Sequence, residues 1–396
     1  MAAARETWIT GIGILSSLGE GLEVHRQRLM AGDVPVVSTT IIPPYVLHPL
    51  AKVEYDKQIP KKGDLRQMEP WQRIGTYAAG LALSEAGVAG KTDILARMDM
   101  IVAAGGGERD VALDCAILTE LRTANNPEAR LNERLQSDLR PTLFLAQLSN
   151  LLAGSISIVH NVVGSSRTFM GEEGAGIEAM RVAHARIEAG QSDIALVGAG
   201  YNGERADMLL LYEFAGLNLK DNFAPIFAPG RPSGMASGSV GTFLVLESRS
   251  YAEARGVKPI ARVRMIRSAQ SRRKEGTAKD SFVKLFEEAK RETDPAKTAV
   301  LSGASGVNPV TGEEAELLAD SKLAVRAIAS RLGHSFEVTF PAGIALAALA
   351  IAGGKLYAPI PNVPLEAKSL DSLRQAIVTC VGHWRGEGVG VVEAIN

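Results

Sequence analysis

The sequence predicts an α/β protein in which short, buried strands alternate with longer helices. Strand-like apolar runs alternate along the chain with segments whose apolar residues recur at helical spacing. Glycine is abundant, with 40 residues, whereas aromatic residues make up only 5% of the chain. Because small residues let helices pack closely on a sheet, this composition favours a layered α/β architecture.

The first 247 residues supply one series of predicted elements. The run 193–199 is continuously apolar, which is typical of a strand covered by helices on both faces. Gly87 directly follows a helical pattern and suits the end of a helix. The expected elements are strands over 8–13, 98–104, 193–199 and 241–247, and helices over 22–31, 71–86 and 177–189.

The alternation restarts after Glu247. No segment rich in Pro or Ser marks a linker near 247–250, so we expect two halves, residues 1–247 and 248–396, that share one core. The expected elements of the second half are strands over 259–266, 299–301, 377–381 and 389–394, and helices over 313–332 and 342–352.

Charge and cysteine content exclude several classes of function. Lys plus Arg number 43 and Asp plus Glu 44, so no global charge favours nucleic acid or a membrane surface. The longest apolar run, 341–351, is shorter than the roughly 20 residues of a membrane span, and we recognise no signal peptide. Cys115 and Cys380 are too few for a disulfide framework, and both lie in apolar segments that we expect to be buried. We expect a cytoplasmic protein.

Two further segments of the sequence could bind a partner protein or a phosphate group. The arginine-rich stretch 262–274 is interpreted as a solvated face or as a docking patch for an acidic carrier protein. The glycine triplet 105–107 lacks the Gly-Lys-Ser/Thr of a phosphate loop. We expect no metal or cofactor, because the four histidines other than His334 and His383 lack metal-ligand spacing: His25, His48, His160 and His184.

Five ordered blocks of sequence carry a more specific signal. They are TGIGILSSLG at 10–19 with LMAG at 29–32, NLLAG at 150–154, AGQSDIALVGAG at 189–200, FAPGRP at 227–232 and GMASGSVGTFLVLE at 234–247. Together they resemble the β-ketoacyl-acyl-carrier-protein synthase family of condensing enzymes. The resemblance implies a thiolase-like, five-layer αβαβα fold of two pseudo-repeated halves, and dimers that form through a sheet edge.

The resemblance also implies catalytic positions. The family uses a cysteine nucleophile at a helix start, where the helix N-terminus stabilises a thiolate, with two histidines and a lysine. The nucleophile motif falls on GEEGAG at 171–176, which places Glu173 at the cysteine. Ser305 falls at the first histidine and Ala329 at the lysine, whereas the Gly-His pair of the second histidine is kept at His334. Standard Claisen condensation is therefore not expected.

The family's gating loop falls on residues 383–387. His383, Arg385 and Glu387 would place polar and charged groups at an acyl entrance, and we treat them as candidate substrate-binding residues. Glu172 replaces Glu173 as the candidate if the alignment is shifted by one residue.

The chemistry of a carboxylate at position 173 favours an occluding role for Glu173 over a catalytic one. A carboxylate at a helix N-terminus is stabilised by about 0.3–1 kcal/mol. It is a poor nucleophile, and an ionised carboxylate repels the carboxylate of a malonyl group. His334 is interpreted as a core histidine, or as a remnant that binds a carbonyl or pairs with Glu173.

Three functions remain open, all with acyl carrier protein as a partner. The first is a non-condensing subunit that resembles a chain-length factor of fatty-acid or polyketide biosynthesis, as a homodimer or paired with a cysteine-bearing ketoacyl synthase. The second is a malonyl-carrier decarboxylase or acyltransferase that uses Glu173 and His334. The third is a module that binds acyl groups or carrier protein.

Overall fold

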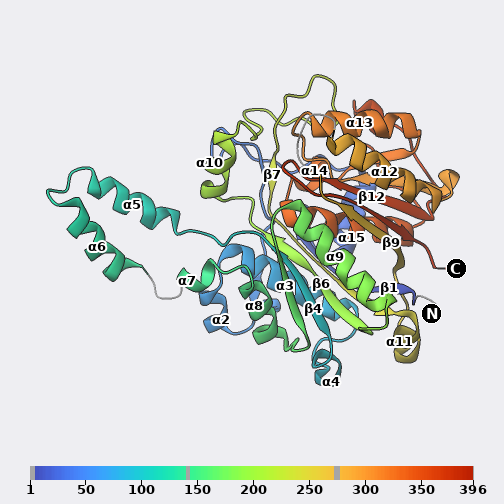
Figure 1. Cartoon of the computed structure of the whole chain (residues 1–396), viewed down its shortest axis with the longest axis horizontal. Helices are drawn as coiled ribbons and strands as arrows, with labels where there is room; N and C mark the ends of the chain where they lie inside the picture. Colours follow the sequence, from blue (N-terminus) through green and yellow to red (C-terminus); the bar gives the residue numbers. More distant parts are fainter. Residues whose placement is uncertain (1–4, 140–142, 272–276, 396) are drawn as a thin grey trace.

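The chain folds into two half-sheets with the same strand pattern (Figure 1). The computed structural model describes residues 5–139, 143–271 and 277–395, and within these residues eleven strands form one hydrogen-bonded sheet. The first half-sheet runs in the order β5 (Ser166–Met170), β4 (Asp99–Ala104), β6 (Ile194–Tyr201), β8 (Val240–Ser248) and β1 (Thr7–Ser16), with β2 (Gly19–Glu20) on β1. The second runs β11 (Ala324–Ala327), β10 (Thr298–Ser302), β12 (Gln375–Val381), β13 (Glu387–Glu393) and β9 (Ala261–Ala269).

The pairing pattern is repeated between the halves. In each half-sheet the first three strands are parallel and the last two pair in antiparallel fashion. The half-sheets join where β1 meets β9, through three residue pairs between Thr7–Ile9 and Ala261–Val263. The predicted fold of two pseudo-repeated halves is confirmed.

Helices complete five layers. The central helices α9 (Glu173–Glu188) and α15 (Thr339–Ala352) share the largest core cluster with strands of both halves. The helices α3 (Pro70–Glu85) and α8 (Leu151–His160) cover the first half-sheet, and α12 (Thr277–Arg291) and α13 (Val310–Ser321) cover the second. The short elements are α1 (Gly21–Ala31), α2 (Lys62–Gln67), α4 (Thr92–Leu95), α7 (Leu143–Ala146), α10 (Ala206–Phe214), α11 (Arg249–Arg255), α14 (Ala329–Leu332), β3 (Leu47–His48), β7 (Ser237–Gly238), η1 (Tyr55–Lys57), η2 (Pro295–Lys297), η3 (Phe336–Val338) and η4 (Pro364–Glu366).

The helix expected over 313–332 is wrong. The structure has α13, which ends at Ser321, then β11, then α14. Lys322 adopts a left-handed backbone with φ of 57°, which stops the helix. Residues 324–327 instead pair in parallel with β10 and are buried. Long-range strand pairing therefore overrides a local helical pattern.

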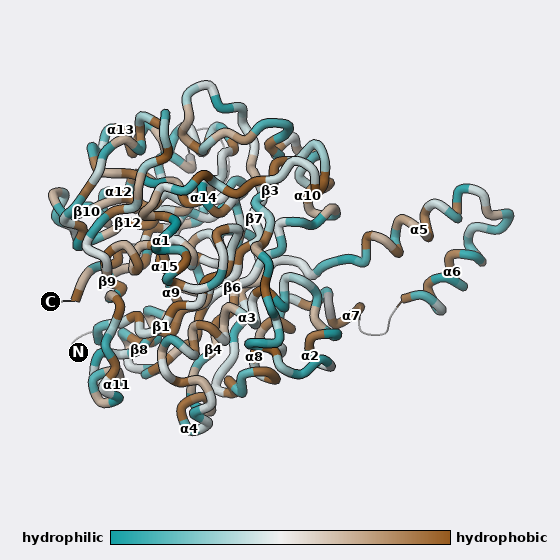
Figure 2. Tube along the Cα trace, turned by 180° about the vertical axis from the view of Figure 1, so that it is seen from behind, coloured by the Kyte–Doolittle hydropathy of each residue, from teal (hydrophilic) through white to brown (hydrophobic). Residues whose placement is uncertain are grey.

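The expectation that Cys115 is buried is also wrong. Cys115 lies in α5 (Val111–Leu121), which with α6 (Pro127–Asp138) forms an arm that projects from the body (Figures 1 and 2). Because the apolar residues of α5 have no sheet to cover, Cys115 is exposed. Cys380 is buried inside β12, as expected.

The described part of the arginine-rich stretch carries paired charges. Arg264 pairs with Glu292 at 2.7 Å and Arg267 with Glu288 at 3.0 Å, which fits a solvated face. Arg272, Arg273 and Lys274 lie outside the described residues. Across the described ranges, no helix is both long and apolar enough to cross a membrane.

Gly176 sets the distance between α9 and η3. A Cβ atom at this position would lie 2.1 Å from the backbone oxygen of Glu337, closer than any real contact. The missing side chain therefore lets the start of α9 touch the segment that carries His334.

Replacing Gly176 by Ala is expected to lower the free energy of unfolding by about 1–3 kcal/mol, because backbone atoms must move apart. Gly63 is the matched control: it lies in α2, and a Cβ there meets nothing within 4 Å. Gly63→Ala is expected to raise stability by up to about 1 kcal/mol. Urea denaturation of both variants checks this, and equal stability of Gly176→Ala and the wild type would contradict it.

Candidate functional site

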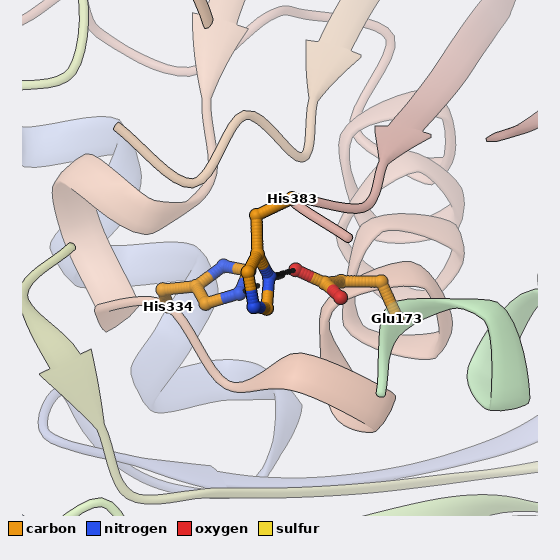
Figure 3. A group of neighbouring side chains, drawn as sticks. All are labelled: Glu173, His334 and His383. Carbon is orange, nitrogen blue, oxygen red and sulfur yellow. Dashed lines mark hydrogen bonds and ion pairs between the residues drawn. The ribbon is translucent and has the colours of Figure 1, made fainter. Parts of the chain in front are cut away.

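Glu173, His334 and His383 meet in the interior (Figure 3). Oε1 of Glu173 accepts hydrogen bonds from Nε2 of His334 at 2.9 Å and from Nδ1 of His383 at 2.9 Å. The side chains of Glu173, His334 and His383 are each no more than 1% exposed. The structure thus pairs Glu173 with His334, and it adds His383 to the pair.

The chain turns sharply to place Glu173. Gly171 has φ of 144°, a conformation that side chains rarely allow, and it directly follows β5. Glu172 occupies the N-cap position of α9 without a side-chain hydrogen bond to the helix, and Glu173 is the first residue of the helix. The N-terminus of a helix carries partial positive charge, so the Glu173 carboxylate occupies a favourable position.

Backbone hydrogen bonds hold both histidines. The N–H of His334 donates to Ala236 at 2.7 Å, and the oxygen of His334 accepts from Gly238 at 2.9 Å. His383 lies in the turn between β12 and β13, which is closed by the bond from Gly382 N–H to Gly386 oxygen at 2.8 Å. The backbone that carries each imidazole is therefore held in place beside Glu173.

The histidines keep Glu173 ionised. Burial alone would raise the pKa of Glu173, but the charge and the hydrogen bonds of His383 and His334 outweigh burial and hold this pKa well below its usual range. The other oxygen, Oε2, is buried and finds no hydrogen-bond partner among the described residues.

Aromatic rings wall the cluster. Phe336 meets His334 edge to face at 4.7 Å and stacks on Tyr212 at 4.9 Å between ring centroids. Phe336 has φ of 47°, which is unusual for a bulky residue and marks a strained backbone. Tyr212 also contacts His383 edge to face at 5.5 Å. These rings shield the carboxylate from water.

Glu337 is a second buried carboxyl that the sequence analysis missed. Oε1 of Glu337 accepts the backbone N–H of Gly105 at 2.9 Å. Burial raises the pKa of Glu337 to about 8, and the nearby Glu173 adds to the rise. A signal was present, since Glu337 is the one charged residue in the apolar run 336–352.

Other sequence candidates make their contacts elsewhere. Ser305 is buried, and its Oγ accepts the N–H of Val307 at 3.2 Å. Ala329 packs in a small apolar cluster at the start of α14. Arg385 is exposed, and Glu387, within β13, accepts the hydroxyl of Ser271 at 2.7 Å.

Glu172 is half-buried beside the cluster. Burial raises its pKa, and the neighbouring Glu173 adds to the rise. The side chain that both histidines contact belongs to Glu173. Glu173 is thus the carboxylate of the cluster.

The cluster contains the donor atoms of a metal site. One ligand atom each from Glu173, His334 and His383 lies within 4.8 Å of the others. Sequence spacing could not reveal this group, because the histidines lie 161 and 210 residues after the carboxylate.

Solved structures share the fold at low sequence identity. The ishigamide ketosynthase/chain length factor superposes with a TM-score of 0.81 at 20% identity, with all of both chains covered. A β-ketoacyl synthase from Burkholderia phymatum STM815 gives 0.78 at 18% identity over 99% of this chain and 100% of that one. The type II polyketide ketosynthase AntDE, in complex with its acyl-carrier protein AntF, gives 0.73 at 15% identity over 99% and 100%.

Sequence comparison identifies the family. No curated protein matches the chain. The profile of the β-ketoacyl synthase N-terminal domain matches residues 5–252, more than half of the chain. Together with the αβαβα fold, this match shows that the chain belongs to the β-ketoacyl synthase family.

Proposed function

We propose that this chain is a non-condensing member of the family and serves as the partner subunit of a cysteine-bearing synthase, as chain-length factors do. The observation that carries the proposal is Glu173 at the first residue of α9, the position that the resemblance assigns to the nucleophile. The two cysteines lie elsewhere, Cys115 in the projecting arm and Cys380 within β12. A carboxylate there is a poor substitute for a thiolate.

The charge at this position also disfavours malonyl decarboxylation. Glu173 is held as an anion and would repel the malonyl carboxylate. The N–H groups of His334 and His383 that could polarise a thioester carbonyl already bond to Glu173. These contacts support a filled position that does not accept substrate.

Glu337 supports the same conclusion. Its raised pKa reflects a dry environment next to an existing negative charge. A malonyl group would bring a second negative charge into this dry environment, beside the Glu173 carboxylate. The proposed function requires no such binding.

A free sheet edge supports pairing with another subunit. Among the described strands, β5 pairs only with β4. Apolar side chains are exposed on and near this edge, with Met170 73%, Val163 60% and Ile158 65% exposed. Because such edges readily bind another chain, we propose that the subunits meet here. An acyl carrier protein is proposed as a further partner, since a ketosynthase of similar fold is held in complex with its own.

Purified protein incubated with malonyl- and acyl-carrier protein is expected to leave every mass unchanged, because no thiolate lies at the start of α9. Intact mass spectrometry of all species checks this result. Loss of carbon dioxide or acyl transfer that disappears in Glu173→Gln or His334→Ala would contradict it and support the decarboxylase or acyltransferase alternative.

The double variant Val163→Asp/Met170→Asp is expected to weaken subunit association by about tenfold or more, because desolvating an unpaired charge is costly. Sedimentation velocity on the chain, alone and co-expressed with cysteine-bearing synthases of its host, checks this. Val34→Asp, at a site that is 82% exposed, is the control and should associate normally. Recovery of homodimer alone beside every host synthase would contradict the proposed heterodimer.

Glu337 makes stability depend on pH. The pKa of the Glu337 carboxyl is raised from the ordinary 4.5 to about 8 in the folded state, so this carboxyl contributes stability to the fold below pH 4.5. The contribution is lost as the pH rises from 4.5 through 8. The Glu337→Gln variant has no carboxyl at this position and does not lose stability in this way. Its free energy of unfolding, relative to that of the wild type, is therefore expected to increase by several kcal/mol between pH 5 and 8.5. Urea denaturation at several pH values checks this, and a pH-independent difference would contradict it.

A further inference from the structure

The buried cluster presents a donor set that transition metals prefer. Two imidazole nitrogens and one carboxylate oxygen are the His₂Glu ligands of several zinc sites and the facial triad of iron sites. All three ligand atoms lie within 4.8 Å of one another. We propose that Glu173, His334 and His383 bind one divalent transition-metal ion, with Zn²⁺ as the representative.

The two distances to the carboxylate oxygen need little adjustment. Oε1 of Glu173 is 2.9 Å from Nε2 of His334 and 2.9 Å from Nδ1 of His383. Donor atoms around a tetrahedral zinc with bonds of 2.0–2.1 Å are separated by roughly 3.3 Å. These two oxygen–nitrogen pairs must therefore open by only a few tenths of an ångström.

Metal binding exchanges the two hydrogen bonds to Glu173 for bonds to the ion. Nε2 of His334 and Nδ1 of His383 both lie against Oε1 of Glu173. Each of these nitrogens must give up its proton before its lone pair can bind the ion, so the protons are released to solvent or pass to the other ring nitrogen.

An unused ligand atom points to the same conclusion. Oε2 of Glu173 is buried without a hydrogen-bond partner among the described residues. A buried oxygen in this state is costly. Bidentate binding by Glu173 would use this oxygen and complete four coordination with the two histidines.

The local charge also suits a cation. The N-terminus of α9 disfavours a cation, but Glu172 and Glu173 carry carboxyl groups at the same helix end. A hollow of about 430 Å³ is lined in part by Gly174, the residue after Glu173, and by Gly386.

The site would join three segments that the sequence keeps apart: the start of α9, the turn before η3 and the turn between β12 and β13. A bound ion therefore adds a cross-link between the two halves of the chain. The inference does not depend on the proposed function, because metal binding is measured without any acyl substrate.

The test uses the full chain freed of metal by a chelator and then titrated with Zn²⁺ alone. We expect one retained equivalent by elemental analysis after gel filtration, together with a rise in Tm. Glu173→Gln and His383→Phe are each expected to lower the Zn²⁺ affinity on the order of 100-fold or more. His184→Gln is the control, because His184 is a buried histidine that bonds to Thr7 outside the cluster.

Cobalt provides a second readout that does not need the variants to fold. The wild-type chain loaded with Co²⁺ is expected to show the visible absorption of a four-coordinate ion with nitrogen and oxygen ligands. Less than a tenth of an equivalent of Zn²⁺ on the wild type, or a Co²⁺ spectrum of the hydrated six-coordinate ion, would overturn the proposal. Equal Zn²⁺ affinity of Glu173→Gln, His383→Phe and wild type would do the same.

Discussion

The hydrogen bonds to one oxygen atom, Oε1 of Glu173, constrain how the two halves of the chain fit together. Glu173 belongs to the first half, whereas His334 and His383 belong to the second. A buried carboxylate must keep its partners, because an unpaired charge in the interior is strongly destabilising. The positions of α9, the turn before η3 and the β12–β13 turn are therefore linked, and Gly176 supplies the close approach that the linkage needs.

The sequence predicted local elements better than long-range ones. The strand expected over 98–104 appears as Asp99–Ala104, because a run of apolar residues covered on both faces is a local signal. The single helix expected over 313–332 is absent, since β11 forms only through its pairing with β10. Glu173 and His334 were found through the resemblance. His383 was also named through the resemblance, as a residue of the gating loop, but its contact with Glu173 could not be read from the sequence, since 210 residues separate the two.

The strained backbone of Phe336 fits this picture. Its φ of 47° persists because the ring is held between Tyr201, Tyr212 and His334. Strain of this kind survives where the surroundings over-determine a conformation, and such places are often functional. Both proposals made for the cluster use this rigidity, since an occluding carboxylate and a metal ligand set each need fixed side chains.

The central helix α15 has a consequence for how the protein is made. It comes from the second half of the chain, yet it packs on β8 and β1 of the first. A ribosome releases the first half-sheet well before α15 is synthesised. The part of this sheet face that α15 covers therefore stays exposed until α15 has been synthesised, and exposed apolar surface of this kind favours aggregation.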